Sequence, residues 1–257
     1  MHSSLRRAGI LAGVLASTLA GTMAMADTFQ VNPSTLPGNT LSPFNADFVD
    51  ASYRATVNQT APSGTCSVAS PCTFNETGTI SFSTFRQGAF PGTPVPASTS
   101  GLNLNGTNSY ALVGTFTGSG TAVPFGDGIR ATFDTFNLTL NANGTPVGSS
   151  TGLIAGQANV FGPALAQGDF DVRLNFQPTG GFFSGLNQLS INTGTLTGVN
   201  TSVTGVTLGT FTGGTINGSG NLQFTTTSPG VIPEPSSILL LGSGLAGLGW
   251  FRRRFRS

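Results

Sequence analysis

The stretch IRATFDTFNLTLNANG, residues 129–144, gives the clearest indication of the fold class. Polar and apolar residues alternate along it, with one slip of register after Phe133, and the apolar series resumes at Phe136. Successive side chains of a strand point to opposite faces, so the alternation predicts a strand with one buried face. Asn143-Gly144 at its end is a strong hairpin signal, because both residues tolerate the positive φ of a tight turn. The stretch therefore predicts a strand followed by a hairpin.

Runs of the same kind recur through the middle of the chain and are separated by Gly, Pro, Ser and Asn. The runs that we expect to be strands are 51–60, 78–86, 110–117, 129–140, 152–161, 170–177, 188–192, 203–212 and 220–227. Helical periodicity is confined to the two ends of the chain. Strands at this spacing are typical of all-β domains, and we expect a single β-sandwich of jelly-roll or immunoglobulin-like type over residues 27–228.

Phenylalanine supplies the large apolar side chains of the expected core, since the chain has 20 Phe but 2 Tyr and 1 Trp. The expected core residues are Phe48, Phe82, Phe85, Phe116, Phe133, Phe136, Phe161, Phe170, Phe176 and Phe211. From residue 180 to residue 220 the composition shifts toward Gly, Thr, Ser and Asn without a fixed period. Flat, polar strands of this kind pair readily along exposed edges, which would suit a protein that assembles outside the cell.

Residues 1–26 resemble a secretory signal peptide. Arg6 and Arg7 precede an apolar stretch, and small residues stand at the −3 and −1 positions of a cut between Ala26 and Asp27. We therefore expect an N-terminal signal helix, export by the Sec machinery and removal of the segment by signal peptidase.

The last segment, residues 229–257, has three parts in a fixed order. Pro233, Glu234 and Pro235 form a rigid polar elbow, and an apolar run of about the length of a short membrane span follows. A basic cluster closes the chain, and its members are Arg252, Arg253, Arg254 and Arg256. We expect a C-terminal transmembrane helix whose arginines stay on the cytoplasmic side.

This order of elbow, apolar helix and arginine cluster resembles the PEP-CTERM sorting signal of Gram-negative bacteria. The resemblance implies that the membrane enzyme exosortase cuts near Pro-Glu-Pro after export, which leaves the protein at the cell surface or in the extracellular matrix. An ordinary C-terminal membrane anchor is the alternative. The chain is also similar to flocculation-associated PEP-CTERM proteins. The similar features are the first residues of the mature chain, Asp27-Thr28-Phe29, and the Phe-rich strands. That resemblance implies a matrix component that works with exopolysaccharide in flocs or biofilm.

Charge and histidine content exclude several classes of function. Between Asp27 and residue 228 the chain has four arginines, eight acidic residues and no lysine, a net charge of −4. Without a basic patch we expect no nucleic acid partner. The single histidine, His2, lies in the signal peptide, so the mature chain has no imidazole for a catalytic triad or a zinc site. We expect the protein not to be an enzyme.

Two cysteines, Cys66 and Cys72, bracket the sequence SVASP. An even count in an exported chain predicts a disulfide, which would pin a local bend rather than join distant strands. A redox or metal pair is the alternative reading.

The carboxylates are the remaining candidates for chemistry. Asp169 and Asp171 lie two apart on an expected strand, so they share one face, and Asp127 stands between two glycines. Asp47 and Asp50 flank the start of another expected strand. These residues would serve solubility, bind calcium or, in pairs, hydrolyse glycosides.

The sequence thus predicts an exported structural or adhesive matrix protein. Its partners would be exosortase, exopolysaccharide and other copies of the chain, and its mechanism would be hydrogen bonding by Thr- and Asn-rich faces. A calcium-assisted carbohydrate-binding module is the first alternative, with no cofactor otherwise expected. A glycosidase or lyase that uses an acid pair is the second.

Overall fold

The computed structural model describes residues 28–62, 64–89, 91–161, 167–196, 200–201 and 211–226. In these ranges the chain is almost entirely β-structure, with a single 3₁₀ turn, η1 (Pro33–Thr35), and one short helix, α2 (Ala97–Ser100). The expected signal helix and transmembrane helix lie outside the described residues. Within those residues, no helix is long and apolar enough to cross a membrane.

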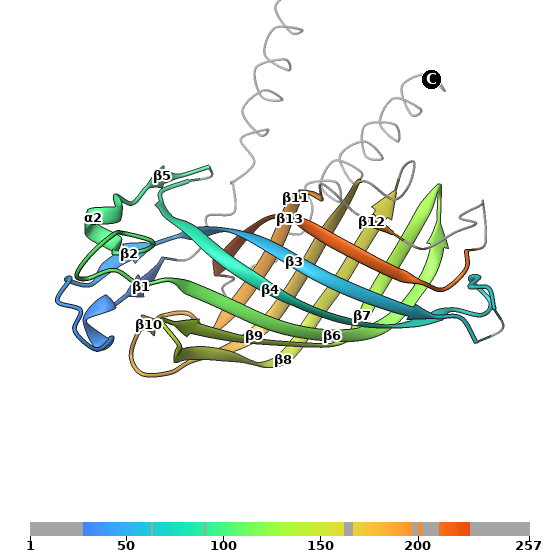
Figure 1. Cartoon of the computed structure of the whole chain (residues 1–257), viewed down its shortest axis with the longest axis horizontal. Helices are drawn as coiled ribbons and strands as arrows, with labels where there is room; N and C mark the ends of the chain where they lie inside the picture. Colours follow the sequence, from blue (N-terminus) through green and yellow to red (C-terminus); the bar gives the residue numbers. More distant parts are fainter. Residues whose placement is uncertain are drawn as a thin grey trace, which may run out of the picture. The chain divides into compact units, whose positions relative to one another are not determined.

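Eight antiparallel strands follow one another around a closed barrel (Figure 1). They are β3 (Phe48–Thr60), β4 (Cys72–Gln87), β6 (Leu112–Phe125), β7 (Gly128–Ala142), β8 (Thr145–Phe161), β9 (Gln167–Pro178), β11 (Gln188–Leu196) and β13 (Thr215–Thr226). Each strand pairs with the next one along the chain. The last strand, β13, also pairs with the first, β3, so the sheet closes on itself.

The closed barrel corrects the expected β-sandwich. Sandwiches and barrels both need strands with one buried face, so the alternation of side chains does not separate the two architectures. Strand length and bending distinguish them. The strands β4 and β8 have 16 and 17 residues, and β-bulges interrupt the register of several pairs, as between Asp50 and Ala51. Bulges increase the local bend and twist of a strand, which lets a single sheet curl round until its ends meet.

Closure also changes the expectation about exposed edges. Among the described strands, each of the eight in the barrel has a hydrogen-bonded neighbour on both sides. The Thr-rich strands near the C-terminal end of the domain therefore have their edges paired within the chain. Contact with other molecules at the barrel wall would have to use outward side chains instead of backbone groups.

A small sheet packs on the barrel. It has the strand order β10-β1-β2 and consists of β1 (Phe29–Val31), β2 (Phe44–Ala46) and β10 (Phe183–Ser184). The Phe29 ring lies 6.5 Å from the Phe85 ring of β4 and 6.1 Å from the Phe183 ring. Two further short strands, β5 (Thr93–Pro94) and β12 (Asn200–Thr201), pair antiparallel with β4 and β13 respectively. Sequence patterns predicted none of these five short strands.

Inward side chains of the barrel strands form one apolar core that includes Phe74, Ile80, Leu138 and Leu174. Glycines at inward positions make room for the largest rings. A Cβ on Gly118 would lie 2.8 Å from the Phe133 ring, which is closer than real Cβ contacts allow. The Phe133 ring therefore packs against the Gly118 backbone, and a side chain at this glycine would displace it.

Most of the expected strands and core residues are confirmed. Eight of the nine expected runs overlap a barrel strand, and most of the ninth, 203–212, lies outside the described residues. The Asn143-Gly144 hairpin joins β7 to β8 with φ of 49° and 81°, and the slip of register after Phe133 is a β-bulge. Nine of the ten expected core phenylalanines are buried, and Phe161 is half-buried.

Candidate functional site

An open groove of about 740 Å³ crosses the outer surface of β13, β3, β4 and β6. Its floor is one row of residues paired across the four strands, in the order Gly218, Ala55, Gly78 and Phe116. Two of these residues are glycine and one is alanine. The side chains of this row belong to the inward series of their strands, so the backbone of the floor lies open on the outer face and a ligand can approach it closely.

Two parallel rows of polar side chains flank this floor. In register order, one row holds Ser219, Arg54, Thr79 and Thr115, and the other holds Asn217, Thr56 and Thr77. They lie at outward positions because they alternate with the buried residues of the same strands. The Thr56 hydroxyl donates to the Asn217 side-chain oxygen over 3.0 Å, which ties β3 to β13 at the groove.

The groove is suited to hydrogen bonding with a polyhydroxylated ligand. A threonine hydroxyl donates one hydrogen bond and accepts two, as a sugar hydroxyl does. Four strands at about 4.8 Å spacing give a row of such groups roughly 14 Å long. Among the described residues that line the groove, Arg54 carries the only charge.

A second cavity, of about 60 Å³, lies inside the barrel. Apolar side chains make up most of its wall, and they include Val57, Phe74, Ile129, Ala158 and Phe170. Three polar side chains also line it, namely Tyr53 and Gln59 of β3 and Glu76 of β4.

Glu76 is the unusual residue of this interior. It is 6 % exposed, and burial raises the pKa of its carboxyl from 4.5 to about 8, so the group is mostly protonated at neutral pH. Burial also raises the pKa of the Tyr53 phenol, and the nearby Glu76 adds to that shift. The Gln59 side-chain oxygen is buried without a hydrogen-bond partner among the described residues.

Sequence reasoning missed this polar group, although the sequence carries a signal for it. Along β4, Phe74, Glu76, Gly78 and Ile80 occupy every second position. Glu76 stands in the apolar series of an alternating strand, which places a carboxyl on the buried face. The net charge alone does not reveal that Glu76 lies on the buried face.

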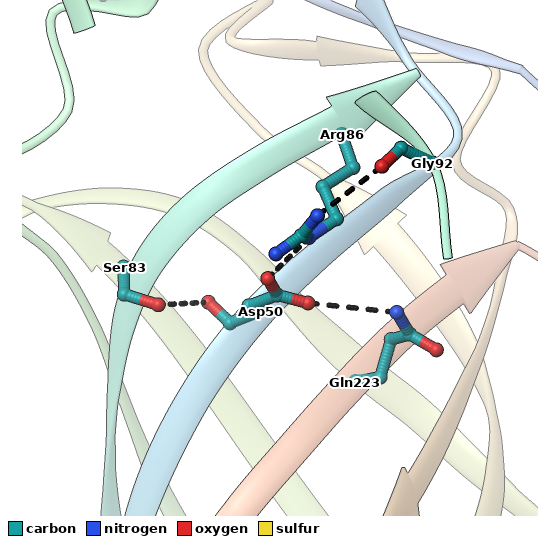
Figure 2. Close-up of polar contacts among 5 residues, drawn as sticks. All are labelled: Asp50, Ser83, Arg86, Gly92 and Gln223. Carbon is teal, nitrogen blue, oxygen red and sulfur yellow. Dashed lines mark hydrogen bonds and ion pairs between the residues drawn. The ribbon is translucent and has the colours of Figure 1, made fainter. Parts of the chain in front are cut away.

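The structure engages Asp47 and Asp50 in local contacts, and Figure 2 shows those of Asp50. Asp50, opposite the β4 bulge, accepts from Arg86 Nε over 2.5 Å and from Gln223 Nε2 over 3.5 Å. Arg86 also donates to the Gly92 carbonyl oxygen over 3.2 Å. Asp47 accepts from the Gly88 backbone N–H over 2.6 Å. These contacts hold β3, β4 and β13 together at one end of the barrel.

The three carboxylates proposed as calcium ligands do not come together in a metal-binding group. Asp169 and Asp171 share the outward face of β9, as expected, and Asp127 lies in the turn between β6 and β7. Asp169 accepts from Asn159 Nδ2 over 2.7 Å. In the described ranges, no three His, Cys, Asp or Glu residues are grouped as metal ligands would be.

Cys66 and Cys72 form the expected disulfide, with Cα atoms 5.1 Å apart. Cys66 also pairs with Phe211 through two backbone hydrogen bonds, of 2.7 and 3.2 Å. The disulfide therefore fixes the loop before β4, and the two hydrogen bonds connect that loop to the segment before β13. It is structural, because both sulfur-bearing residues are completely buried.

The remaining predicted positions lie outside the described residues. They are the cleavage site between Ala26 and Asp27, the motif Pro233, Glu234 and Pro235, and the cluster Arg252, Arg253, Arg254 and Arg256. Their evidence is the sequence itself. The family model of the PEP-CTERM protein-sorting motif matches residues 231–254. No curated protein and no solved structure matches the chain.

Proposed function

From the PEP-CTERM sorting motif, which marks an exported substrate of exosortase, we propose that the protein is a structural or adhesive component of the extracellular matrix. It would bind exopolysaccharide and help to hold cells together in flocs or biofilm. The Sec machinery and signal peptidase would export it, and exosortase would process it at Pro233–Pro235. Its role in this proposal is physical rather than catalytic.

The observation that carries the proposal is the hydroxyl-lined groove across β13, β3, β4 and β6. Its two polar rows cross strands that are fixed on both sides by hydrogen bonds, so the backbone that carries the hydroxyls is held in place before a ligand arrives. A pre-organised row of weakly bonding groups suits a repeating polymer, because each further repeat unit adds hydrogen bonds to protein groups that are already ordered.

Charge supports a polysaccharide over other polymers. The mature chain has a net charge of −4 and no lysine, which argues against polyanions held by many salt bridges. Arg54 lies in one row of the groove and would contact a carboxylate or a hydroxyl of the sugar chain.

Co-sedimentation of the exported protein with exopolysaccharide from the same cells tests the proposal. Thr77→Val and Thr115→Val remove groove hydroxyls while keeping β-branched shape, and together they should weaken binding by about tenfold. Thr132→Val, at an exposed outward position of β7 that pairs with Thr121 and lies away from the groove, is the matched control and should bind as wild type.

Cells that make the double variant should also form weaker flocs than cells that make the control. If the double variant binds exopolysaccharide as tightly as wild type, the groove is not the binding surface. If the wild-type protein does not sediment with exopolysaccharide at all, the matrix role itself is wrong.

A further inference from the structure

Arg54 carries the positive charge of the outer groove across β13, β3, β4 and β6. Its side chain is exposed, because Arg54 alternates along β3 with the buried residues Tyr53 and Ala55. Ser219 of β13 and Thr79 of β4 are its direct cross-strand neighbours. Directly opposed residues of antiparallel strands have Cβ atoms roughly 4.5–5.5 Å apart, so a hydroxyl-bearing side chain stands on each side of Arg54.

The charge of Arg54 has no counter-charge beside it on the protein surface. Among the described residues, the only ion pair joins Arg86 to Asp50, and no hydrogen bond there involves the Arg54 guanidinium. Asp50 is the nearest acidic residue along β3, four positions and roughly 13 Å from Arg54. Glu76 of β4 is buried in the barrel interior. The guanidinium is therefore available to an anionic group from outside.

The rest of the groove lining is uncharged and rich in hydroxyls. Thr79 and Thr115 continue the row that contains Arg54, and Thr77 and Asn217 belong to the row on the other side of the floor. Residues two apart on a strand lie about 6.6 Å apart, so the two rows run side by side at that separation. A ligand that matches this lining has many hydroxyls along its length and an acidic group on the Arg54 side.

We propose that the groove binds a carboxylated polysaccharide and that Arg54 holds one sugar carboxylate at a time. This inference rests on the proposed polysaccharide role and adds the class of sugar. The guanidinium would donate two parallel hydrogen bonds to the carboxylate oxygens, and the Thr79 hydroxyl would donate a third. The hydroxyls of neighbouring sugars would bond to Thr77, Thr115 and Asn217.

A sugar carboxylate fits the groove better than a neutral sugar or a dense polyanion. The planar guanidinium matches the planar carboxylate, and hydrogen bonds between two ions are stronger than those to a neutral hydroxyl. A polymer with a charge on every unit would meet one cation in the groove and a mature chain with a net charge of −4. An acidic sugar that recurs along an otherwise neutral chain satisfies both conditions.

Removal of the carboxylates from the polymer tests the proposal. The probe is exopolysaccharide from the same cells, before and after reduction of its carboxyl groups to alcohols with carbodiimide and borohydride. In co-sedimentation at low salt, the wild-type protein should bind the native polymer about fivefold more tightly than the reduced polymer, as expected for one exposed ion pair. The preference should disappear near 1 M salt, where the Debye length is only about 3 Å.

The two proposals fail in different ways in this experiment. Equal binding of the native and the reduced polymer at low salt would refute the carboxylate and leave the matrix role standing. Absence of binding to both polymers would refute the matrix role together with the carboxylate.

Two variants locate the preference. Arg54→Gln should bind both polymers equally and, because Arg54 is exposed, should fold as wild type. Arg173→Gln removes the same charge from the outer face of β9, outside the groove, and should keep the fivefold preference. A preference that survives in Arg54→Gln would place carboxylate recognition elsewhere. An equal loss in both variants would show an effect of net charge and refute the assignment to the groove.

Discussion

Phe224 of β13 lies opposite Val49 of β3, and this pair belongs to the seam that closes the barrel. Both side chains are buried, with exposed fractions of 1 % and 5 %. The Phe224 ring also lies 4.7 Å from the Phe82 ring of β4, across β3. The seam therefore joins strands from the two ends of the domain and ties them to its first hairpin.

Phe224→Ala should destabilise the protein strongly, because it empties a packed position where three parts of the chain meet. We expect a loss of about 3–5 kcal/mol in the free energy of unfolding. Urea denaturation followed by circular dichroism, which needs no tryptophan, measures this free energy. Asn221→Ala, at an exposed position of the same strand, should change this free energy by less than about 0.5 kcal/mol. Similar losses in both variants would mean that the seam is not a packed core.

Tyr110→Phe should leave the stability unchanged or raise it by about 1 kcal/mol. The Tyr110 side chain is buried, its hydroxyl has no hydrogen-bond partner in the described part of the chain, and burial raises the pKa of its phenol. Its ring packs on the Phe182 ring at 5.4 Å, and phenylalanine keeps that contact. Thermal unfolding of the two proteins measures the difference. A large loss on removing the hydroxyl would show that it has a partner.

The strands of the barrel could be predicted from the sequence, because alternation is a local pattern. The stretch 129–144 already contained its bulge and its hairpin turn, since Phe133, Phe136 and Asn143 each constrain only their neighbours. The closure could not be predicted. Whether Phe224 pairs with a residue of β3 or remains at an edge depends on curvature summed over eight strands, and no short stretch encodes that sum.

The candidate sites divide in a similar way. Spacing and exported context were enough to predict the disulfide between Cys66 and Cys72. The outer groove depends on cross-strand register, which places Thr56 beside Thr77 and Asn217 although these residues are far apart in the chain. The polar group of Tyr53, Gln59 and Glu76 inside the barrel was missed because no motif marks Glu76 in the sequence. Its raised pKa comes from the apolar residues that the fold brings around it.

Glu76 should make the protein less stable as pH rises. Its pKa is raised from 4.5 to about 8 by burial, so between these values the unfolded chain releases a proton that the folded protein keeps. The folded state therefore binds more protons, and the free energy of unfolding falls by up to about 1.4 kcal/mol per pH unit in this window. The contribution is fully present below about pH 4.5 and is lost as pH approaches 8.

Glu76→Gln should remove this dependence. The variant and the wild type should have similar stabilities near pH 5, and the variant should be more stable by a few kcal/mol near pH 8. Denaturation series at several pH values measure the difference. Thr77→Ala keeps Glu76 and should retain the wild-type slope. Parallel pH profiles of Glu76→Gln and wild type would mean that Glu76 ionises freely in the folded protein.

Processing at the C-terminal motif should define the mature protein. The motif at residues 231–254 places Pro233, Glu234 and Pro235 before an apolar run and terminal arginines, the order that exosortase substrates share. Intact mass of protein from the outside of wild-type cells should therefore begin at Asp27 and end near residues 233–236. In cells that lack exosortase, the protein should keep Arg252 to Ser257 and remain with the membrane. Because signal peptidase acts independently, the mass should begin at Asp27 in both strains.

An added mass at the C-terminal end would indicate transfer to a glycan or lipid. A C-terminal tail retained in both strains would identify that tail as a plain membrane anchor.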